Sequence, residues 1–366
     1  MKKPQIAAYY FPNFHQDKRN AAIHGAGWTE WELVRQARPR FPNHNQPLVP
    51  LWGYEDESDP NVMRRKIKTA HQFGIDAFIF DWYYYEDGMF LEEALEKGFM
   101  PASLGTDFKF ALMWANHNWC NIHPWTPGTP KSILYPGQLT DQTFDKMCDY
   151  IIRHYFKHPN YWKINGCPYF SIYLTDTSIL QRLELLRHKV RVAGFPDVHL
   201  NMIFQEEAIL PGENGMKNKE KLIQSGTFNS LTSYVWVHHC IFPHFPVSSY
   251  KEMMDEYFKF YKENKARYQL PYYPNVTMGW DSSPRTDQSS AFKEYGYPYT
   301  SIMPSTPELF HEAMNTALAE NSDIITINAW NEWTEGSYLE PDTIHKTAFL
   351  EALRKSLPAD KTNIHQ

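Results

Sequence analysis

The sequence predicts a (β/α)₈ barrel, and three observations support this fold class. Eight short apolar segments, rich in β-branched and aromatic residues, alternate along the 366 residues with longer segments of helical periodicity. The chain has no GxGxxG loop of the kind that opens a dinucleotide-binding sheet. It also has no repeat, low-complexity tract or linker, so we expect residues 1–366 to form a single domain. A doubly wound open sheet is the alternative fold.

Each predicted strand is an apolar run of the kind found in buried parallel sheets. The strands are expected at residues 6–11, 75–82, 108–114, 169–174, 198–204, 231–237, 276–279 and 323–329. The helices are expected at 61–73, 90–99, 140–156, 179–193, 250–268 and 306–320. Gly74 directly follows the first helix and Pro307 lies in the first turn of the last, as helix termini favour. Residues 12–60 are predicted to be a long irregular loop, and loops of this length inside a compact domain are usually functional.

Charge and composition exclude several classes of partner. The formal net charge is −6, so no basic surface for nucleic acid is expected. No uncharged span approaches the ~20 residues of a membrane helix, so membrane insertion is not expected. The N-terminus has no apolar segment typical of a signal peptide. We therefore expect a cytoplasmic location for the chain as written, or a periplasmic or secreted one if a signal peptide has been removed.

Aromatic residues make up 16% of the chain, with 12 Trp, 23 Tyr and 23 Phe. Aromatic rings stack on the apolar faces of sugar rings while neighbouring polar groups bind the hydroxyls. The composition therefore favours a carbohydrate substrate, although most of the Phe residues are expected to be core.

The stretch at residues 323–341 contains the strongest functional signal. A β-branched strand there runs into Glu332 and Glu335, at the strand end where an α/β barrel keeps its chemistry. Two neighbouring carboxylates are the minimum equipment for cleaving a glycosidic bond. A solvated acidic loop is the alternative, but the flanking Trp330, Trp333 and Tyr338 argue against it. We expect Glu332 and Glu335 to be catalytic.

The other strand ends and their loops are expected to bind the substrate. The expected substrate-binding residues are Tyr10, Trp28, Asp81, Trp82, Trp114, Asn116, Asn118, Trp236, Trp280, Asp281, Arg285, Asn331 and Trp333. The same strand ends would also deliver Tyr9, Gln205, Glu206 and His238. Asp81 could equally orient a catalytic group, and Asp281 with Arg285 could equally form a structural ion pair at the barrel rim.

We expect neither a metal nor a cofactor. His238, His239, Cys240 and His244 have the residue types for zinc, as do Cys120 and His123. Neither group has a standard ligand spacing, and adjacent histidines on a strand point to opposite faces. The four cysteines lie far apart, so free thiols are expected, with one disulfide as the alternative.

Five motifs together resemble the WbsX family, whose members are related to glycoside hydrolase family 99. The motifs are GWTEW at 27–31, IDAF at 75–78, WANHNW at 114–119, GWDSSPR at 279–285 and AWNEWTEG at 329–336. The resemblance extends over about residues 9–341. It implies a barrel with retaining, endo-acting chemistry on α-mannosides, with Glu332 matching the base and Glu335 the acid. The position of Thr334 is often histidine in family 99, and this departure bears on mannoside specificity more than on mechanism.

The spacing of the two glutamates suggests a particular mechanism. Because both come from one turn, they approach the sugar from a common side, which suits a base acting on the sugar's own 2-hydroxyl. A conventional retaining enzyme would need a carboxylate after the fourth strand, where only Asp176 is near. We therefore predict a glycoside hydrolase. A transglycosylase or glycosyltransferase of polysaccharide biosynthesis, and a catalytically silent carbohydrate-binding barrel, are the alternatives.

Overall fold

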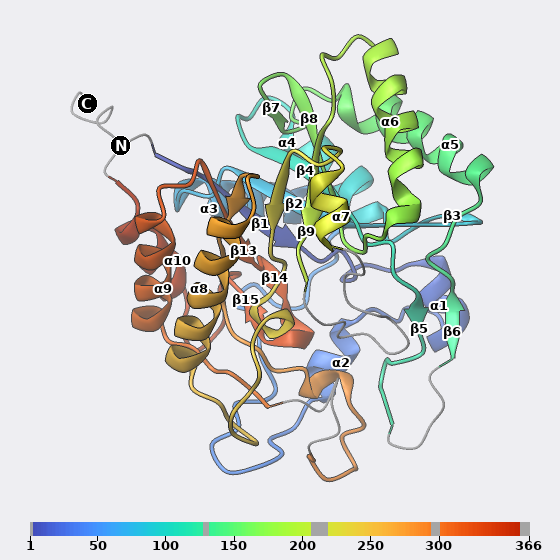
Figure 1. The fold of residues 1–366 in the computed structure, drawn as a ribbon. Helices are drawn as coiled ribbons and strands as arrows, with labels where there is room; N and C mark the ends of the chain where they lie inside the picture. The colour runs from blue at the N-terminus through green and yellow to red at the C-terminus, as the bar shows by residue number, and fades with distance from the viewer. Residues whose placement is uncertain (1–2, 127–131, 206–218, 294–300, 359–366) are drawn as a thin grey trace.

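A computed structural model describes residues 3–126, 132–205, 219–293 and 301–358 (Figure 1). The chain forms a ring of parallel strands surrounded by helices, which confirms the predicted barrel. The strands of the ring are β1 (Gln5–Tyr10), β2 (Ala77–Tyr85), β4 (Lys109–Trp114), β8 (Cys167–Ile172), β9 (His199–Ile203), β10 (Ser230–Thr232), β11 (Tyr272–Tyr273), β12 (Asn275–Thr277) and β13 (Ile324–Asn328). Their order is β11-β10-β9-β8-β4-β2-β1-β13-β12, and all of these pairs are parallel.

The ring closes through the seventh strand, which is divided at Pro274. Its first part, β11, pairs with β10, and its second part, β12, pairs with β13. Pro274 has no N–H to donate, but its carbonyl accepts the N–H of Thr326 in β13 at 3.0 Å. The two short pieces therefore act as one strand between the sixth and the eighth.

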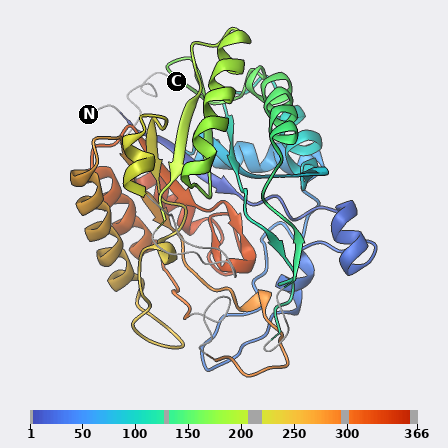
Figure 2. The ribbon, with the colours of Figure 1, turned by 45° about the vertical axis from the view of Figure 1, so that its right-hand side comes forward.

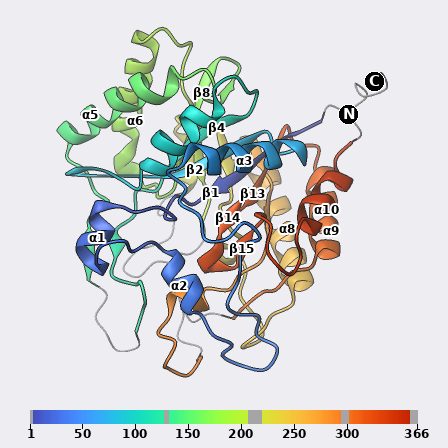
Figure 3. The ribbon, with the colours of Figure 1, turned by 180° about the vertical axis from the view of Figure 1, so that it is seen from behind.

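Helices cover the outside of the ring. They are α3 (Pro60–Gln72), the π-helix η1 (Ala94–Phe99), α4 (Met100–Ser103), α5 (Asp141–Ile151), the π-helix η2 (Ile152–Phe156), α6 (Leu180–Val192), α7 (Lys219–Gln224), α8 (Tyr250–Arg267), α9 (Pro307–Ala319) and α10 (Ala348–Ser356). Figure 2 shows α8 and α9 on one side of the sheet and α5 and α6 on another, and Figure 3 shows α3 across the back. None of the helices in the described ranges is long and apolar enough to cross a membrane.

Side-chain caps begin four of these helices. Asp59, Thr140, Ser249 and Thr306 each accept a backbone N–H from the first turn of α3, α5, α8 and α9, respectively. Such a cap satisfies one of the N–H groups that a helix start leaves unpaired, which fixes where the helix begins.

Short elements decorate the loops around the ring. They are α1 (Lys18–His24), α2 (Trp31–Gln36), β3 (Gly88–Phe90), β5 (Trp119–Cys120), β6 (Ile133–Tyr135), β7 (Lys163–Ile164), η3 (Thr177–Ile179), η4 (Trp236–His238), η5 (Ser283–Arg285), β14 (Asn331–Glu332), η6 (Trp333–Glu335) and β15 (Ser337–Tyr338). The presence of α1 and α2 corrects the prediction that residues 12–60 are irregular throughout. All four cysteines are free.

Two predicted elements differ from the structure for identifiable reasons. The sixth strand ends at Thr232 rather than 237. The Trp236 ring instead stacks on Tyr257 of α8, and its indole N–H donates to the Asn275 carbonyl. The helix expected at 90–99 begins only at Ala94, because β2 continues to Tyr85 and pairs with β3.

A glycine sets the spacing between η1 and the loop that precedes α3. A Cβ added at Gly98 would lie 2.1 Å from the Glu57 carbonyl oxygen and 2.9 Å from Met63 Cγ. The first neighbour is backbone and cannot rotate away, so a side chain at this position must displace the loop.

We predict that Gly98→Ala lowers the free energy of unfolding by about 1–3 kcal/mol, the usual cost of overpacking a core. Urea denaturation would measure the loss. Lys97→Ala, a change of the exposed neighbour on the same helix, is the control and should leave the transition nearly unchanged. Equal stabilities for the wild type and Gly98→Ala would show that a side chain at position 98 does not have to displace the loop.

Candidate active site

A short hairpin after β13 carries the two glutamates. In this hairpin β14 pairs with β15, and the 3₁₀ turn η6 lies between them. Gly336 closes the turn with φ of 61°, in the left-handed region. A Cβ there would come within 2.8 Å of Asp281 Cβ and 3.0 Å of the Asp281 nitrogen. The turn therefore packs directly on the loop after β12.

Arg285 lies at the centre of the site and contacts three carboxylates. Its Nε is 2.9 Å from Glu30 Oε1, its Nη1 bonds Glu335 Oε1, and its Nη2 is 3.4 Å from Glu332 Oε2. All four side chains are buried, with exposures of 0% for Glu30, 5% for Arg285, 3% for Glu332 and 8% for Glu335. The fork of donors on a guanidinium suits this role, because it can bind several carboxylates in fixed directions.

Glu30 is held from three sides. Besides Arg285, it accepts hydrogen bonds from the Thr334 hydroxyl and the Asn13 amide. Asn13 in turn accepts from Asn20 of α1 at 2.7 Å. Burial pushes the pKa of Glu30 upward, but Arg285, His123 and the hydrogen bonds outweigh it and hold the pKa below its ordinary value. Glu30 is therefore the ionised partner of Arg285.

A fourth carboxyl, Asp81 in the middle of β2, joins the cluster through Tyr234. The Tyr234 hydroxyl is 2.7 Å from Asp81 Oδ2 and 3.2 Å from Glu332 Oε1. A hydroxyl has one proton to donate, so two such hydrogen bonds require a proton on one of the two carboxyls. Burial raises the pKa of Asp81 well above its ordinary value, with Glu335 adding to the shift.

The two glutamates of the hairpin differ in their surroundings. Burial raises the pKa of Glu332 well above its ordinary value, and the neighbouring Glu335 adds to the shift. Burial also raises the pKa of Glu335, against the opposing pull of Arg285. Two carboxyls this close separate into one charged and one protonated group near neutral pH. The close contact with Arg285 favours the charge on Glu335 and the proton on Glu332.

These groups face a cavity of about 70 Å³ with aromatic walls. Its lining includes Phe11, Asp81, Tyr83, Asn118, Trp119, His117, His123, Tyr173, Tyr234, His238, Arg285, Glu332 and Glu335. Burial lowers the pKa of His117 and of His123 to about 4, and that of His238 to about 3. The three histidines are therefore neutral near pH 7, and Arg285 is the cation among the described lining residues.

A second buried cation, Lys66 of α3, is linked through two carboxylates to the side chains on both sides of Glu332. Lys66 Nζ is 2.6 Å from Glu57 Oε1 and 2.8 Å from Glu340 Oε1. Glu57 also accepts the Asn331 amide at 3.0 Å, and Glu340 accepts the Trp333 indole N–H at 3.0 Å. Asn331 in addition exchanges two hydrogen bonds with the backbone of Phe11, each of 2.8 Å.

The structure brings some of the expected site residues together and separates others. Asp81, Asn118, Arg285, Glu332 and Glu335 line the cavity. Asn331 and Trp333 flank Glu332, and Tyr10 lies beside Glu57 on the Lys66 side. Trp114, Asn116 and Gln205 line a neighbouring pocket. Trp28 is half-buried and stacks on His24.

The remaining tryptophans do not reach the cavity. Trp82 bonds Tyr155 of η2, Trp236 packs against α8, and Trp280 is buried where its backbone pairs with Met303. Tyr9 is fully buried and packs edge-on against Tyr234. Glu206 lies outside the described residues.

The alternative of an Arg285–Asp281 ion pair is wrong. Asp281 instead binds His44 Nε2 at 2.8 Å and the Gln46 amide at 2.7 Å. The backbone turn of η5 sends Arg285 inward to the glutamates, while Asp281 stays on the side of residues 44–46.

The adjacent histidines do not lie on a strand, contrary to the expectation from the sequence, because His238 ends the 3₁₀ turn η4 and His239 follows it. His238 lines the cavity, whereas His239 stacks on Phe260 of α8. Within the described part of the chain, no group of three His, Cys, Asp or Glu side chains is placed to hold a metal ion.

The sequence argument missed Glu30, Tyr234 and Lys66. Glu30 lies inside the GWTEW motif, so its position was signalled but not its role. Tyr234 follows the sixth strand and could have been included with the other strand-end aromatics. Lys66 lies on the core-facing side of α3. Because a lysine in a helix is usually exposed to solvent, its residue type did not indicate a buried position.

The Glu57 carboxyl gives a pH-dependent prediction. Burial raises its pKa to about 7, although Lys66 opposes the shift. The folded state therefore keeps a proton that the unfolded chain loses near its ordinary pKa, so this group costs stability as the pH rises from about 4.3 to about 7. We predict that Glu57→Gln removes this cost, so that the melting temperature of the variant minus that of the wild type increases between pH 5 and pH 8.

Glu351→Gln, on the exposed face of α10, is the matched control and should show a constant difference. A constant difference for Glu57→Gln as well would mean that Glu57 is ionised throughout this range.

Comparison with known proteins agrees with this architecture. The model of the family described as "Glycosyltransferase WbsX" matches residues 6–353. "Uncharacterized protein WxcX" of Xanthomonas campestris pv. campestris, from strains B100 and ATCC 33913, is 27% identical over 360 residues, which cover 96% of this chain and 49% of the relative. The chain thus spans about half the length of the curated relatives that it matches.

Solved structures share the fold at low sequence identity. A "Glycoside hydrolase-like protein" has a TM-score of 0.64 with 13% identity, covering 98% of this chain and 95% of that one. The family 99 endo-α-mannosidase of Bacteroides thetaiotaomicron, in complex with Bis-Tris-propane, has a TM-score of 0.60 with 14% identity and covers 97% of both chains. These structures support the barrel, and the family match shows that the chain belongs to the WbsX family.

Proposed function

We propose that the protein is a retaining glycoside hydrolase that acts on an α-linked, mannoside-like oligo- or polysaccharide. The observation that carries this proposal is the pair of buried carboxyls, Glu332 and Glu335, on one turn at the C-terminal end of the barrel and bridged by Arg285. The aromatic walls of the cavity and its neutral histidines suit an uncharged sugar ring. The endo-α-mannosidase among the solved structures supports the substrate class.

In the proposed first step, Glu332 takes the proton of the sugar's 2-hydroxyl. That oxygen then attacks the anomeric carbon as the glycosidic bond breaks, and Glu335 gives its proton to the leaving oxygen. In the second step water attacks the anomeric carbon and gives a proton to Glu335, while the bond between that carbon and the 2-oxygen breaks and the 2-oxygen regains its proton from Glu332. The two inversions leave the anomeric configuration unchanged.

These roles require the proton on Glu335, whereas the contact with Arg285 favours a proton on Glu332. Substitution of each glutamate in turn therefore tests which carboxyl is the base and which is the acid. Arg285 contacts both carboxyls of the pair, and Glu30 contacts Arg285, so these two charges would hold the total charge of the pair while a proton moves between its carboxyls.

We predict that the protein releases reducing ends from α-linked manno-oligosaccharides, and that Glu335→Gln loses about 10²–10⁴-fold of the rate, the usual contribution of a general acid. An aryl glycoside with a good leaving group should restore much of the loss in Glu335→Gln and little in Glu332→Gln. Glu184→Gln, exposed on α6, is the matched control.

Each other outcome favours a stated alternative. Rescue of Glu332→Gln rather than Glu335→Gln would reverse the two roles. Sugar transfer only with a nucleotide-sugar donor would support a glycosyltransferase, the function that the family's description names. Binding of the oligosaccharides without cleavage would support a carbohydrate-binding barrel.

A further prediction identifies the nucleophile of the proposed reaction. If the 2-hydroxyl oxygen attacks, a 2-deoxy-2-fluoro α-mannoside with a good leaving group should bind but neither turn over nor label the protein. Intact-protein mass spectrometry would show the unmodified mass. A mass increase of one fluoroglycosyl unit, mapped to Glu332, would instead identify Glu332 as a direct nucleophile.

A further inference from the structure

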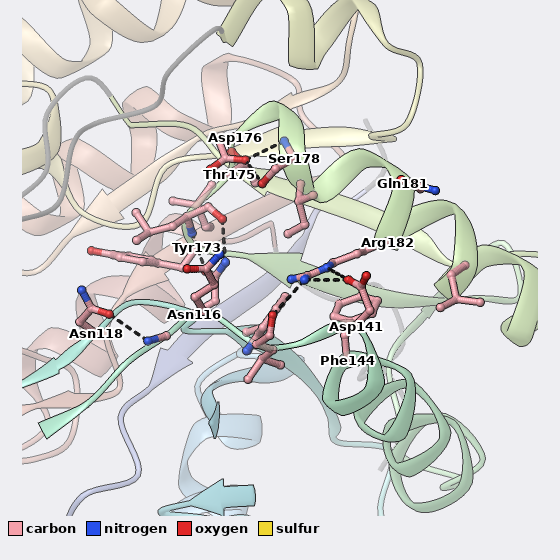
Figure 4. Close-up of a pocket in the computed structure, with 18 of the residues that line it drawn as sticks. Asn116, Asn118, Asp141, Phe144, Tyr173, Thr175, Asp176, Ser178, Gln181 and Arg182 are labelled. Carbon is pink, nitrogen blue, oxygen red and sulfur yellow. Dashed lines mark hydrogen bonds and ion pairs between the residues drawn. The ribbon is translucent and has the colours of Figure 1, made fainter. Parts of the chain in front are cut away.

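A larger pocket adjoins the carboxylate cavity (Figure 4). It has a volume of about 870 Å³ and lies at the C-terminal ends of β4, β8 and β9, between α5 and α6. Asn118 and Tyr173 line both spaces. The cavity of about 70 Å³ is smaller than the usual 300–1,000 Å³ of a ligand pocket, whereas the larger pocket lies within this range.

The pocket combines a buried, mainly apolar floor with a polar rim. Its floor includes the buried side chains of Trp114, Leu139, Phe144 and Tyr173. Figure 4 shows Asp176 and Ser178 on one side and Asp141 and Arg182, from α5 and α6, on another. Aromatic surface below and hydrogen-bonding groups above are what a sugar ring requires, because its faces are apolar and its edges carry hydroxyls.

The shape of the pocket is fixed by hydrogen bonds between its loops. The Asn116 amide donates to the Leu174 carbonyl at 2.8 Å, and its oxygen accepts the Leu174 N–H at 2.7 Å. The Gln205 amide donates to the Tyr173 carbonyl at 2.8 Å. These bonds tie the ends of β4, β8 and β9 together, so the pocket is formed before any ligand arrives.

Two lining residues carry buried polar atoms that are unpaired among the described residues. They are Nε1 of Trp114, which is 2% exposed, and the hydroxyl of Thr175, which is 7% exposed. A buried polar atom without a partner is unfavourable, and a hydroxyl of a bound ligand would supply the missing hydrogen bond. Both atoms therefore favour a ligand rich in hydroxyl groups.

The charges of the lining disfavour an acidic ligand. The lining cation among the described residues, Arg182, is bonded to Asp141 at 2.8 Å and to the Leu139 carbonyl at 2.9 Å. Asp176 contributes a second carboxylate, which is exposed and accepts the Ser178 N–H. Two carboxylates against one guanidinium leave the pocket with a net negative charge, which would repel uronic acids and phosphorylated sugars.

We propose that this pocket binds further, uncharged sugar residues of an oligosaccharide whose scissile bond lies at Glu332 and Glu335. This inference rests on the proposed function and extends it. The substrate is then a neutral glycan of several residues, and much of its affinity comes from sugars that are not cleaved. Tyr173 and Asn118 mark the path along which the chain passes from one space to the other.

The test measures binding to Glu335→Gln, which keeps the pocket while slowing cleavage. The probes are linear α-linked manno-oligosaccharides of one to six residues, and the same set oxidised at C6 to uronic acids. Isothermal titration calorimetry should show an affinity for the hexamer at least about tenfold above that for the dimer. The oxidised hexamer should bind about tenfold more weakly than the neutral one.

Two further substitutions, each added to Glu335→Gln, locate the effect. Gln181→Trp places a large ring at the rim and should reduce the advantage of the hexamer to within about threefold, while the dimer keeps its affinity. Glu184→Trp, also exposed on α6 but outside the lining, is the control and should retain the full advantage. Asp176→Asn keeps a side-chain oxygen for the Ser178 N–H and should weaken the discrimination against the oxidised hexamer.

The outcomes separate this inference from the proposed function. A hexamer that binds no more tightly than the dimer, or Gln181→Trp behaving like Glu184→Trp, would overturn the subsite. Equal affinities for neutral and oxidised hexamers would overturn its preference for uncharged sugars. No binding at any length would contradict the proposed function itself.

Discussion

The candidate site depends on one buried guanidinium. Arg285, in the loop after β12, is 5% exposed. It contacts Glu30, from the loop after β1, and both Glu332 and Glu335, from the hairpin after β13. Removing a partner from a buried charge cluster is costly, because the remaining charges stay buried without compensation. Three loops that are distant in sequence are thereby held in one arrangement, and the carboxyl pair keeps its place only while the arginine is present.

A second cation acts on the opposite side of the same hairpin. Lys66 binds Glu57 and Glu340, which in turn hold Asn331 and Trp333. Glu332 thus stands between two residues whose side chains are fixed by hydrogen bonds to one buried network. Arg285 contacts the carboxyl pair itself, and Lys66 holds the side chains that flank Glu332 through Glu57 and Glu340. With one buried cation on each side, the acidic residues of this hairpin can be buried.

The sequence was informative wherever a local pattern carries the signal. The eight strands and most helices follow from apolar runs, caps and glycines, and the strand-end rule led to Asp81, Asn118, Arg285, Glu332 and Glu335, which line one cavity. Contacts over long separations could not be predicted in this way, such as that of Glu30 with Arg285 across 255 positions. The rule also misplaced Trp82 and Trp236, because a large ring near a strand end can pack against the outer helices as well as toward the cavity.

The packing of Gly336 against Asp281 has a consequence for how such a barrel can diversify. Any larger residue at 336 would collide with the backbone of the neighbouring loop at Asp281. A substitution of Gly336 would therefore require that loop to move. The rim formed by residues 176–182 has no such restriction, because several of its side chains are exposed. Under the proposed function, glycan preference could therefore change at the rim while the carboxyl pair stays the same, so that specificity and catalysis would vary independently on one scaffold.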